Sequence, residues 1–345
     1  MGSRLRPITY AMPKHLVPLM GKAMIEYPIE HLVDIGVRDI GIVVGYLGEL
    51  IQEYLGDGSR YGSRFHYIRQ EERKGIAHAI HLSITEGFID ESFIVYLGDN
   101  ILSKGLGKYS RIMVEEDPDV FILLARVKDP SRFGVAVLEN GRITNVVEKP
   151  REFISDLAVI GVYYFRDPDL VERAYSTLKP SWRGEYEITE VIKWFIDHGY
   201  NVKYEITDGW WKDVGTPEGL LEALYLLLDS TSGRIEGEVV GEITGRVVVE
   251  KGAVVEGKVY GPAYIGPNAH IGENAVVEHY SSVESGVRVV SGKIARSLIM
   301  DDTIVDIGSL RLIESVIGMN SLVKSTRELH GDIKLEVSNF SKIII

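Results

Sequence analysis

The first residues that could do chemistry lie at the start of the chain. The run Gly-Ser-Arg-Leu-Arg-Pro occupies residues 2–7, and Pro13-Lys14 follows. A glycine-containing turn lets backbone N–H groups approach phosphate oxygens, and nearby basic side chains neutralise the charge. Arg4 and Lys14 could both reach one triphosphate if the loop folds back. The alternative interpretation is a solvated basic segment.

Two aspartates stand at distant points of the chain. Asp99 lies in a Leu-Gly-Asp-Asn run at residues 97–100, and Asp213 lies in a Trp-Lys-Asp-Val-Gly-Thr run at 211–216. Mg²⁺ is a hard cation that prefers one or two carboxylates together with substrate phosphates. Two aspartates converging from distant strand ends could hold one ion between them. Each aspartate alone is also typical of a turn or a helix cap.

A loop at residues 70–79 separates a predicted strand from a predicted helix that opens at Gly75. In open α/β sheets, ligands bind at the carboxyl ends of strands, where this loop would lie. The Gln70 amide offers both a donor and an acceptor, which suits the edge of a nucleobase. An ordinary connecting loop is the alternative.

A Glu-Lys-Pro run at residues 148–150 ends a predicted hairpin. Lys149 could pair with a phosphate, and Glu148 could accept hydrogen bonds from sugar hydroxyls. Gly134, which begins the same hairpin, would let the backbone approach a ligand closely. The alternative for the two charged residues is a surface ion pair.

Short apolar strand patterns alternate with helical patterns from residue 24 to about 229. The continuous apolar run at 40–44 indicates a strand covered on both faces, and Asn140-Gly141 indicates a hairpin turn. This alternation predicts an α/β fold, with a Rossmann-like and mostly parallel sheet between helices. The predicted strands are 40–44, 65–69, 93–97, 120–127, 134–138, 143–147 and 159–165, and the predicted helices are 49–55, 76–84, 170–178, 188–198 and 220–228.

The period changes after a small polar linker at residues 229–233. Small or β-branched apolar residues then recur every six positions from Val247 to Val289, and a second series runs from Leu298 to Leu322. This spacing is typical of an all-β left-handed hexapeptide β-helix and predicts roughly four coils. We therefore expect a nucleotide-binding domain at 1–229, a β-helix at 235–323 and a C-terminal tail at 324–345. A β-sandwich is the alternative.

Composition excludes several classes of function. The net charge of −12 argues against binding a nucleic-acid polymer or an anionic membrane, because both need a positive field. The chain has no cysteine, which excludes disulfides, cysteine-ligated metals and a thiol nucleophile, and fits a cytoplasmic location. No apolar run is long enough to span a membrane, and no signal peptide precedes the first strand.

Taken in order, these motifs resemble one family, the sugar-phosphate nucleotidylyltransferases, and within it the long form of the glucose-1-phosphate thymidylyltransferases. The resemblance covers residues 1 to about 229, and the long form also carries a short β-helix. The motifs that carry it are Gly2 to Pro7 with Pro13-Lys14, the Gln70/Gly75/Ala77 segment, Gly-Asp-Asn at 98–100, Phe-Gly-Val at 133–135, Glu-Lys-Pro at 148–150 and Trp-Lys-Asp-Val-Gly-Thr at 211–216.

The resemblance implies a role for each matching residue. The implied reaction is a Mg²⁺-dependent, in-line attack of glucose 1-phosphate on the α-phosphorus of dTTP, giving dTDP-glucose and pyrophosphate. Arg4, Lys14 and Lys149 would be catalytic cations, and Asp99 and Asp213 would bind Mg²⁺. The implied nucleotide-binding residues are Gly2, Ser3, Gln70 and Gly75, and the implied sugar-binding residues are Gly134, Glu148 and Val159.

The first strand and leading glycines of the family pattern are absent from this sequence, so we expect that the start site was placed about ten residues too late, at an internal Met.

Three alternatives stay open: a UTP-using enzyme, a bifunctional enzyme whose β-helix is an acetyltransferase using His270 or His279, and a non-catalytic regulatory subunit. The exposed ends of a β-helix need covering, which predicts a homo-oligomer in which the apolar 343–345 segment caps or pairs.

Overall fold

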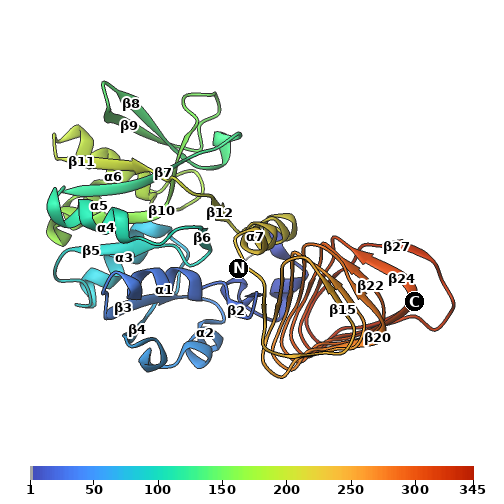
Figure 1. Ribbon diagram of the computed structural model, residues 1–345. Helices are drawn as coiled ribbons and strands as arrows, with labels where there is room; N and C mark the ends of the chain where they lie inside the picture. The colour runs from blue at the N-terminus through green and yellow to red at the C-terminus, as the bar shows by residue number, and fades with distance from the viewer. Residues whose placement is uncertain (1–2) are drawn as a thin grey trace. The chain divides into compact units, whose positions relative to one another are not determined.

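The structure, a computed structural model, describes residues 3–345. The chain divides into two compact units, one formed by Met1–Tyr27 together with Lys212–Ile345 and the other by Pro28–Trp211. The interpretation as domains 1–229 and 235–323 with a separate tail stays a prediction. Each unit is described below by itself (Figure 1).

A six-stranded sheet forms the centre of the Pro28–Trp211 unit. Its order is β11-β7-β10-β8-β9, and β5 pairs with β10. β11 is parallel to β7, whereas β10 runs antiparallel to β5, β7 and β8. β3 and β4 form a separate parallel pair. The strand bounds are β3 Asp39–Val44, β4 Arg64–Arg69, β5 Phe93–Tyr96, β6 Asn100–Leu102, β7 Val120–Arg126, β8 Gly134–Glu139, β9 Arg142–Glu148, β10 Leu157–Phe165 and β11 Val202–Ile206.

Three helices cover this sheet with their apolar faces. α6 (Ile188–Asp197) contributes Val191, Ile192 and Phe195, which are buried with Ile122 of β7 in one core cluster. α3 (Ile76–Thr85) and α5 (Pro168–Thr177) complete the layer. The α/β, Rossmann-like class is therefore confirmed. The expectation of a mostly parallel sheet is not met in the six-stranded sheet, where β11 and β7 are the parallel pair and the other pairs are antiparallel. The remaining helices of the first half are α1 Glu26–Asp34, α2 Gly48–Leu55 and α4 Gly107–Glu115, with 3-10 turns η4 Ser59–Tyr61 and η5 Pro130–Arg132.

Every strand and helix predicted for the first half is present, with ends shifted by a few residues. The hairpin turn is confirmed as well, because Asn140 and Gly141 both have positive φ angles of 51° and 75°. The sequence patterns missed α1 and α4. Pro28 lies in the first turn of α1, a residue more often read as a turn signal, and α4 is a mainly polar segment that buries Tyr109 and Met113.

The other unit begins with short elements. Three 3-10 turns, η1 Ser3–Leu5, η2 Ile8–Tyr10 and η3 Lys14–Leu16, precede a small antiparallel hairpin of β1 (Pro18–Leu19) and β2 (Lys22–Ala23). The chain returns to this unit through the end of β12 (Trp211–Asp213) and α7 (Pro217–Asp229). Thr216 starts α7, because its hydroxyl accepts a hydrogen bond from the Gly219 N–H at 3.1 Å and proline follows it.

A parallel β-solenoid of about six turns follows α7 (Figure 1, orange to red). One face stacks the strands β13-β16-β19-β21-β23-β25-β28 in that order, and all these pairs are parallel. The strand bounds are β13 Arg234–Ile235, β14 Glu238–Val239, β15 Glu242–Thr244, β16 Val247–Val249, β17 Val254–Val255, β18 Lys258–Tyr260, β19 Ala263–Ile265, β20 His270–Val277, β21 Ser281–Val283, β22 Arg288–Ala295, β23 Leu298–Ile299, β24 Ile304–Ile313, β25 Val316–Ile317, β26 Leu322–Lys324, β27 Gly331–Ile333, β28 Glu336–Val337 and β29 Lys342–Ile344.

The six-residue spacing identifies the solenoid interior correctly in its first series. All eight residues of that series, from Val247 to Val289, are buried in one core cluster. In the second series the register prediction is wrong by one position at several places. Val305 is fully buried in this cluster, whereas its predicted neighbour Ile304 is 37% exposed. Two apolar residues stand side by side at each of these positions, so spacing alone cannot decide which one points inward.

The solenoid has more than the predicted four coils: it starts close to the predicted residue 235, but it extends beyond the predicted end at 323. It begins at β13, before the six-residue spacing becomes visible. At the other end, β28 pairs with β25 and β29 pairs with β26, so residues 336–344 continue the stack. The segment expected to be a tail therefore contains strands of the solenoid. The coil length also varies, since Val247 pairs with Ala263 and Ala263 with Ser281.

Candidate active site

The turn after β5 holds the first candidate metal ligand. The Asn100 side chain donates from Nδ2 to Asp99 Oδ1 at 2.8 Å, and its Oδ1 accepts from Gly161 N and from Trp211 Nε1 at 3.2 and 2.7 Å. Asn100 is only 4% exposed, so these bonds fix it in the structure. Asn100 thereby orients the Asp99 carboxylate at the end of the strand.

A buried tyrosine lies close to both Asp99 and Glu148. Tyr163 of β10 is buried, and burial raises the pKa of its phenol first of all. The negative charges of Glu148 and Asp99 raise the same pKa further, because both carboxylates lie close enough to disfavour a phenolate. Both acids therefore flank one neutral, uncharged phenol.

Four residues meet around Glu148, and we call them the Glu148 cluster: Gly134, Glu148, Val159 and Thr189. The Thr189 hydroxyl donates to Glu148 Oε2 at 3.1 Å. A Cβ placed on Gly134 would lie 2.5 Å from Thr189 Cγ2 and 3.3 Å from Glu148 Oε2, with Val159 Cβ at 3.8 Å. The structure therefore brings together all three residues predicted to contact a sugar, and it explains why glycine stands at 134.

Lys149 and Arg183 add positive charge beside this cluster. Lys149 Nζ lies 3.4 Å from Glu148 Oε1, and the Lys149 backbone takes a left-handed φ of 42° after the end of β9. Arg183 contacts the same Glu148 oxygen at 3.5 Å and binds Glu187 at 2.8 Å. Arg183 is also paired with Glu185 at 2.9 Å, so its charge is shared among three carboxylates. Lys149 is therefore the cation better suited to an anionic ligand that also carries hydroxyls.

The Gln70 and Gly75 pair forms a separate site in the same unit. Gln70 Nε2 donates to Gly75 O at 3.2 Å and lies 3.0 Å from His78 Nδ1, which orients the amide. Burial lowers the pKa of His78, with Lys74 and His81 adding to the effect, so a neutral ring faces the amide. Gly75 has a φ of 91°, and a Cβ there would meet Tyr186 O at 2.5 Å. Only glycine fits this helix start.

In the other unit, the N-terminal turns meet the segment around Asp213. Arg4 lies in η1 and Lys14 begins η3. A Cβ on Gly215 would lie 3.0 Å from an Arg4 guanidinium nitrogen, so this arginine packs against the chain two residues beyond Asp213. The structure thus brings Arg4 and the Asp213 segment together. Ser3 begins η1, and Gly2 lies outside the described residues.

The predicted Mg²⁺ ligands fit the ion by the chemistry of their donors. Both are carboxylates, and the predicted nucleotide would supply phosphate oxygens as further hard ligands. Within residues 3–345, no group of three or more His, Cys, Asp or Glu side chains could hold a metal ion alone. Phosphate oxygens of a bound nucleotide could complete a site with two aspartates. Asp99 and Asp213 belong to different compact units, and their convergence stays a prediction.

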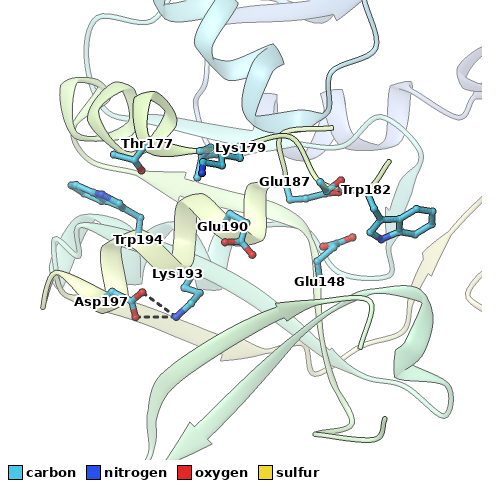
Figure 2. Close-up of a pocket in the computed structure, with 11 residues that line it drawn as sticks. Glu148, Thr177, Lys179, Trp182, Glu187, Glu190, Lys193, Trp194 and Asp197 are labelled. Carbon is cyan, nitrogen blue, oxygen red and sulfur yellow. Dashed lines mark hydrogen bonds and ion pairs between the residues drawn. The ribbon is translucent and has the colours of Figure 1, made fainter. Parts of the chain in front are cut away.

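A cavity of about 370 Å³ begins at Glu148 (Figure 2). Its size lies within the range of small-molecule sites. Figure 2 shows Glu148 of β9 facing Glu187, the residue before α6, and Glu190 within that helix, while Lys193 pairs with Asp197 at 3.0 Å. The remaining lining residues are Thr177, Leu178, Lys179, Ser181, Trp182 and Trp194.

Sequence reasoning missed three residues that shape these sites. Thr189 and Arg183 contact Glu148 from distant points of the chain, and no local pattern marks them. Asn100 stands directly after Asp99, so its place at a strand end was a usable signal. The solenoid histidines make structural contacts: His270 Nε2 pairs with Glu256 at 3.2 Å, and His279 Nδ1 lies 2.6 Å from Gly261 O.

Comparison with known proteins defines the class that this fold and these sites indicate. The model of the nucleotidyl transferase family matches residues 1–230, and the chain belongs to that family. The matched residues include every predicted site residue.

Individual relatives extend the comparison to nearly the whole chain. The chain is 36% identical over 335 residues to a glucose-1-phosphate thymidylyltransferase of Streptomyces antibioticus, covering 96% of this chain and 92% of the relative. It is 39% identical over 238 residues to a UTP–glucose-1-phosphate uridylyltransferase of Haloferax volcanii, covering 68% and 96%. A crystal structure of a Bacillus anthracis protein assigned as a glucose-1-phosphate thymidylyltransferase, in complex with sucrose, matches with a TM-score of 0.61 at 36% identity, covering 68% and 94%.

Among residues 3–345, no helix is long and apolar enough to cross a bilayer.

Proposed function

We propose that this chain transfers a thymidylyl group from dTTP to glucose 1-phosphate, giving dTDP-glucose and pyrophosphate. The similarity to a glucose-1-phosphate thymidylyltransferase extends over 96% of the chain and includes the solenoid. Each sequence motif that indicates this chemistry lies within the matched family region. The proposal therefore rests on both halves of the molecule.

The Glu148 cluster is the observation that carries the proposal. A carboxylate held by the Thr189 hydroxyl at 3.1 Å, and packed closely against Gly134, suits the hydroxyls of a sugar. Lys149, 3.4 Å from that carboxylate, supplies the cation for the sugar phosphate. A sugar 1-phosphate has both groups on one small molecule, and it matches this pairing of an acid with a cation.

The mechanism follows from charge. The attacking oxygen of a sugar 1-phosphate is already anionic, so the reaction needs little proton transfer. Two polyanions must nevertheless approach each other, and Lys149, Arg4 and Lys14 would neutralise this repulsion and the charge that develops on the leaving pyrophosphate. Gln70, oriented through Gly75, would hold the pyrimidine edge.

Asp99 and Asp213 would hold Mg²⁺ in this proposal. When bound, the ion would neutralise phosphate charge in the transition state. Asn100 contributes by fixing the Asp99 carboxylate through the 2.8 Å hydrogen bond.

UTP is the second candidate nucleotide, because a uridylyltransferase is 39% identical to this chain over 238 residues. The Gln70 amide can pair with the polar edge of either pyrimidine, and the extra methyl group of thymine lies away from that edge. We also infer a cytoplasmic location, where nucleoside triphosphates are supplied, and a homo-oligomer, which stays a prediction from the solenoid ends.

Pyrophosphate release across a panel of nucleotides and sugar 1-phosphates tests the proposal. We expect the highest kcat/KM with dTTP and glucose 1-phosphate, and strict dependence on both substrates and on Mg²⁺. A higher kcat/KM with UTP would replace the nucleotide assignment by the second candidate. Absence of pyrophosphate release with every pair would contradict the proposed function.

A further inference from the structure

A buried glutamate of the solenoid holds the N-terminal segment, residues 3–27. Glu284 directly follows β21 and is 0% exposed. Its Oε1 accepts a hydrogen bond from Met20 N at 3.0 Å, and its Oε2 accepts one from Gly21 N at 2.7 Å. The Ser282 hydroxyl is a third donor, to Oε1. A carboxylate 263 residues away in the sequence thus binds two successive backbone N–H groups.

The geometry of the turn explains why these N–H groups are available. Met20 and Gly21 connect β1 to β2, and both have positive φ angles of 53° and 79°. Such a two-residue turn of the I′ type points its N–H groups outward, since they are not used by the hairpin itself. A Cβ at Gly21 would collide with the Tyr264 hydroxyl of β19, so the turn packs closely on the solenoid.

Backbone hydrogen bonds connect the Met20–Gly21 hairpin to Lys14. Met24 N donates to Val17 O at 3.0 Å, and Ile25 N donates to His15 O at 2.9 Å. Val17 N in turn donates to Lys14 O at 3.1 Å. The hairpin and the η3 turn therefore form one bonded piece, and Glu284 fixes the far end of that piece to the solenoid.

The N-terminal segment combines short regular elements with apolar side chains that are fully buried, among them Leu5, Val17 and Met24. Its elements are 3-10 turns of three residues and strands of two residues. A second contact with the solenoid lies at Met12, whose sulfur is 3.4 Å from Asn339 Nδ2. Figure 1 shows the segment, in blue, beside α7 and the solenoid. Elements this short are not stable by themselves, so the segment takes its position from its buried side chains and from its hydrogen bonds to the solenoid.

We propose that Glu284 is a positioning residue for the triphosphate, and that the solenoid is thereby part of the nucleotide site. The inference rests on the proposed function, in which Arg4 and Lys14 bind the triphosphate. It assigns the solenoid a role in catalysis beyond assembly. A buried carboxylate costs free energy unless hydrogen-bond donors surround it. The solenoid at Glu284 therefore depends on the N-terminal turn, which supplies two of these donors.

Kinetics of three variants of the full chain test this inference. Glu284→Ala removes the acceptor, Glu284→Gln keeps one acceptor oxygen, and Glu273→Ala is the control, because Glu273 is an exposed glutamate of the same solenoid. We expect Glu284→Ala to raise the KM for dTTP at least tenfold, with less than a twofold change in the KM for glucose 1-phosphate. Glu284→Gln should recover part of this loss, and Glu273→Ala should match the wild type.

Hydrogen–deuterium exchange gives a readout that needs no turnover. Peptides spanning residues 10–27 should exchange at least tenfold faster in Glu284→Ala than in the wild type, and Glu284→Gln should show an intermediate rate. If Glu284→Ala does not fold, Glu284→Gln should still be folded and provides the test. If both Glu284 variants are active, with an unchanged KM for dTTP and unchanged exchange, this inference is overturned while the proposed function stands. A wild-type chain without pyrophosphate release would overturn the proposed function and this inference together.

Discussion

The two parts of the proposed site are supported in different ways. The Glu148 cluster stands on β8, β9, β10 and α6, so its residues are fixed by a large sheet and by the helix that covers it. The N-terminal segment consists of short turns and a hairpin of two-residue strands, and it is held by buried apolar side chains and by a distant glutamate that binds its end. The comparison shows that the Glu148 cluster is supported within its own sheet and helix, whereas the N-terminal segment is held partly by the solenoid of its own unit.

The largest expected effect tests whether the Glu148 cluster is catalytic at all. Lys149→Ala removes the cation beside Glu148 and should lower kcat by about a hundred- to a thousandfold, because charge neutralisation contributes most to this type of transfer. Steady-state pyrophosphate release at saturating substrates and Mg²⁺ measures it. Lys104→Ala, which removes an exposed lysine paired with Asp208, is the control and should retain full activity. Equal activity of the two variants would remove Lys149 from the mechanism.

The next effect concerns the glutamate that supports the N-terminal segment. Burial, with a smaller contribution from Asp301, raises the pKa of Glu284 to about 7 from an ordinary 4.5. Between pH 4.5 and pH 7, Glu284 keeps its proton in the folded chain and loses it in the unfolded chain. The stabilisation that comes from this bound proton is complete below pH 4.5 and is lost as the pH rises through 7.

The variant Glu284→Gln does not titrate at this position and provides the reference. The free energy of unfolding of the wild type, relative to Glu284→Gln, should fall by about 3 kcal/mol between pH 4.5 and pH 8. Asp301, whose pKa burial raises to about 6, is present in both proteins and largely cancels in the difference. Denaturant titrations at several pH values measure this, and a difference that stays constant with pH would contradict the burial of a titrating carboxyl.

A smaller effect is expected from crowding the Glu148 cluster. Gly134→Ala places a Cβ 2.5 Å from Thr189 Cγ2, so the cluster must shift. We expect about a tenfold rise in the KM for glucose 1-phosphate with little change in the KM for dTTP. Gly107→Ala is a matched control, because it lies in α4 with nothing within 4 Å of the added atom. A change in the dTTP KM instead would place Gly134 on the nucleotide.

The smallest effect comes from one hydrogen bond. Thr189→Val removes the donor to Glu148 Oε2, and it should lower kcat/KM for glucose 1-phosphate about fivefold, in line with about 1 kcal/mol for such a bond. Thr144→Val, at an exposed position of β9, serves as the comparison. If both variants behave alike, Thr189 has no role in holding the carboxylate.

The sequence predicted the parts of the fold that depend on local pattern. Apolar runs and turn residues located the strands and helices of the first half, and the six-residue spacing located the solenoid interior up to Val289. Beyond that point, pairs such as Ile304-Val305 left the inward residue undecided. The length of the solenoid was underestimated, because its first coils expose most of their residues and show little apolar spacing.

The site residues also divide into those that local sequence pattern predicts and those that only the folded chain brings together. Strand ends and turns marked Asp99, Glu148 and Gly134, because these positions follow from local pattern. The contacts of Thr189 with Glu148 and of Glu284 with the turn at Met20 join residues 41 and 264 positions apart. No spacing rule in one sequence predicts such pairs, since they arise only when the chain folds.

The kinetics of the double variant Gly134→Ala/Glu284→Ala, beside its two single variants, test the central claim that the two halves are supported separately and used together. We predict that the double variant combines the raised glucose 1-phosphate KM of Gly134→Ala with the raised dTTP KM of Glu284→Ala, each unchanged in size, as independent sites should. If either single variant moves both constants by the same factor, the two halves share one support and the account is contradicted.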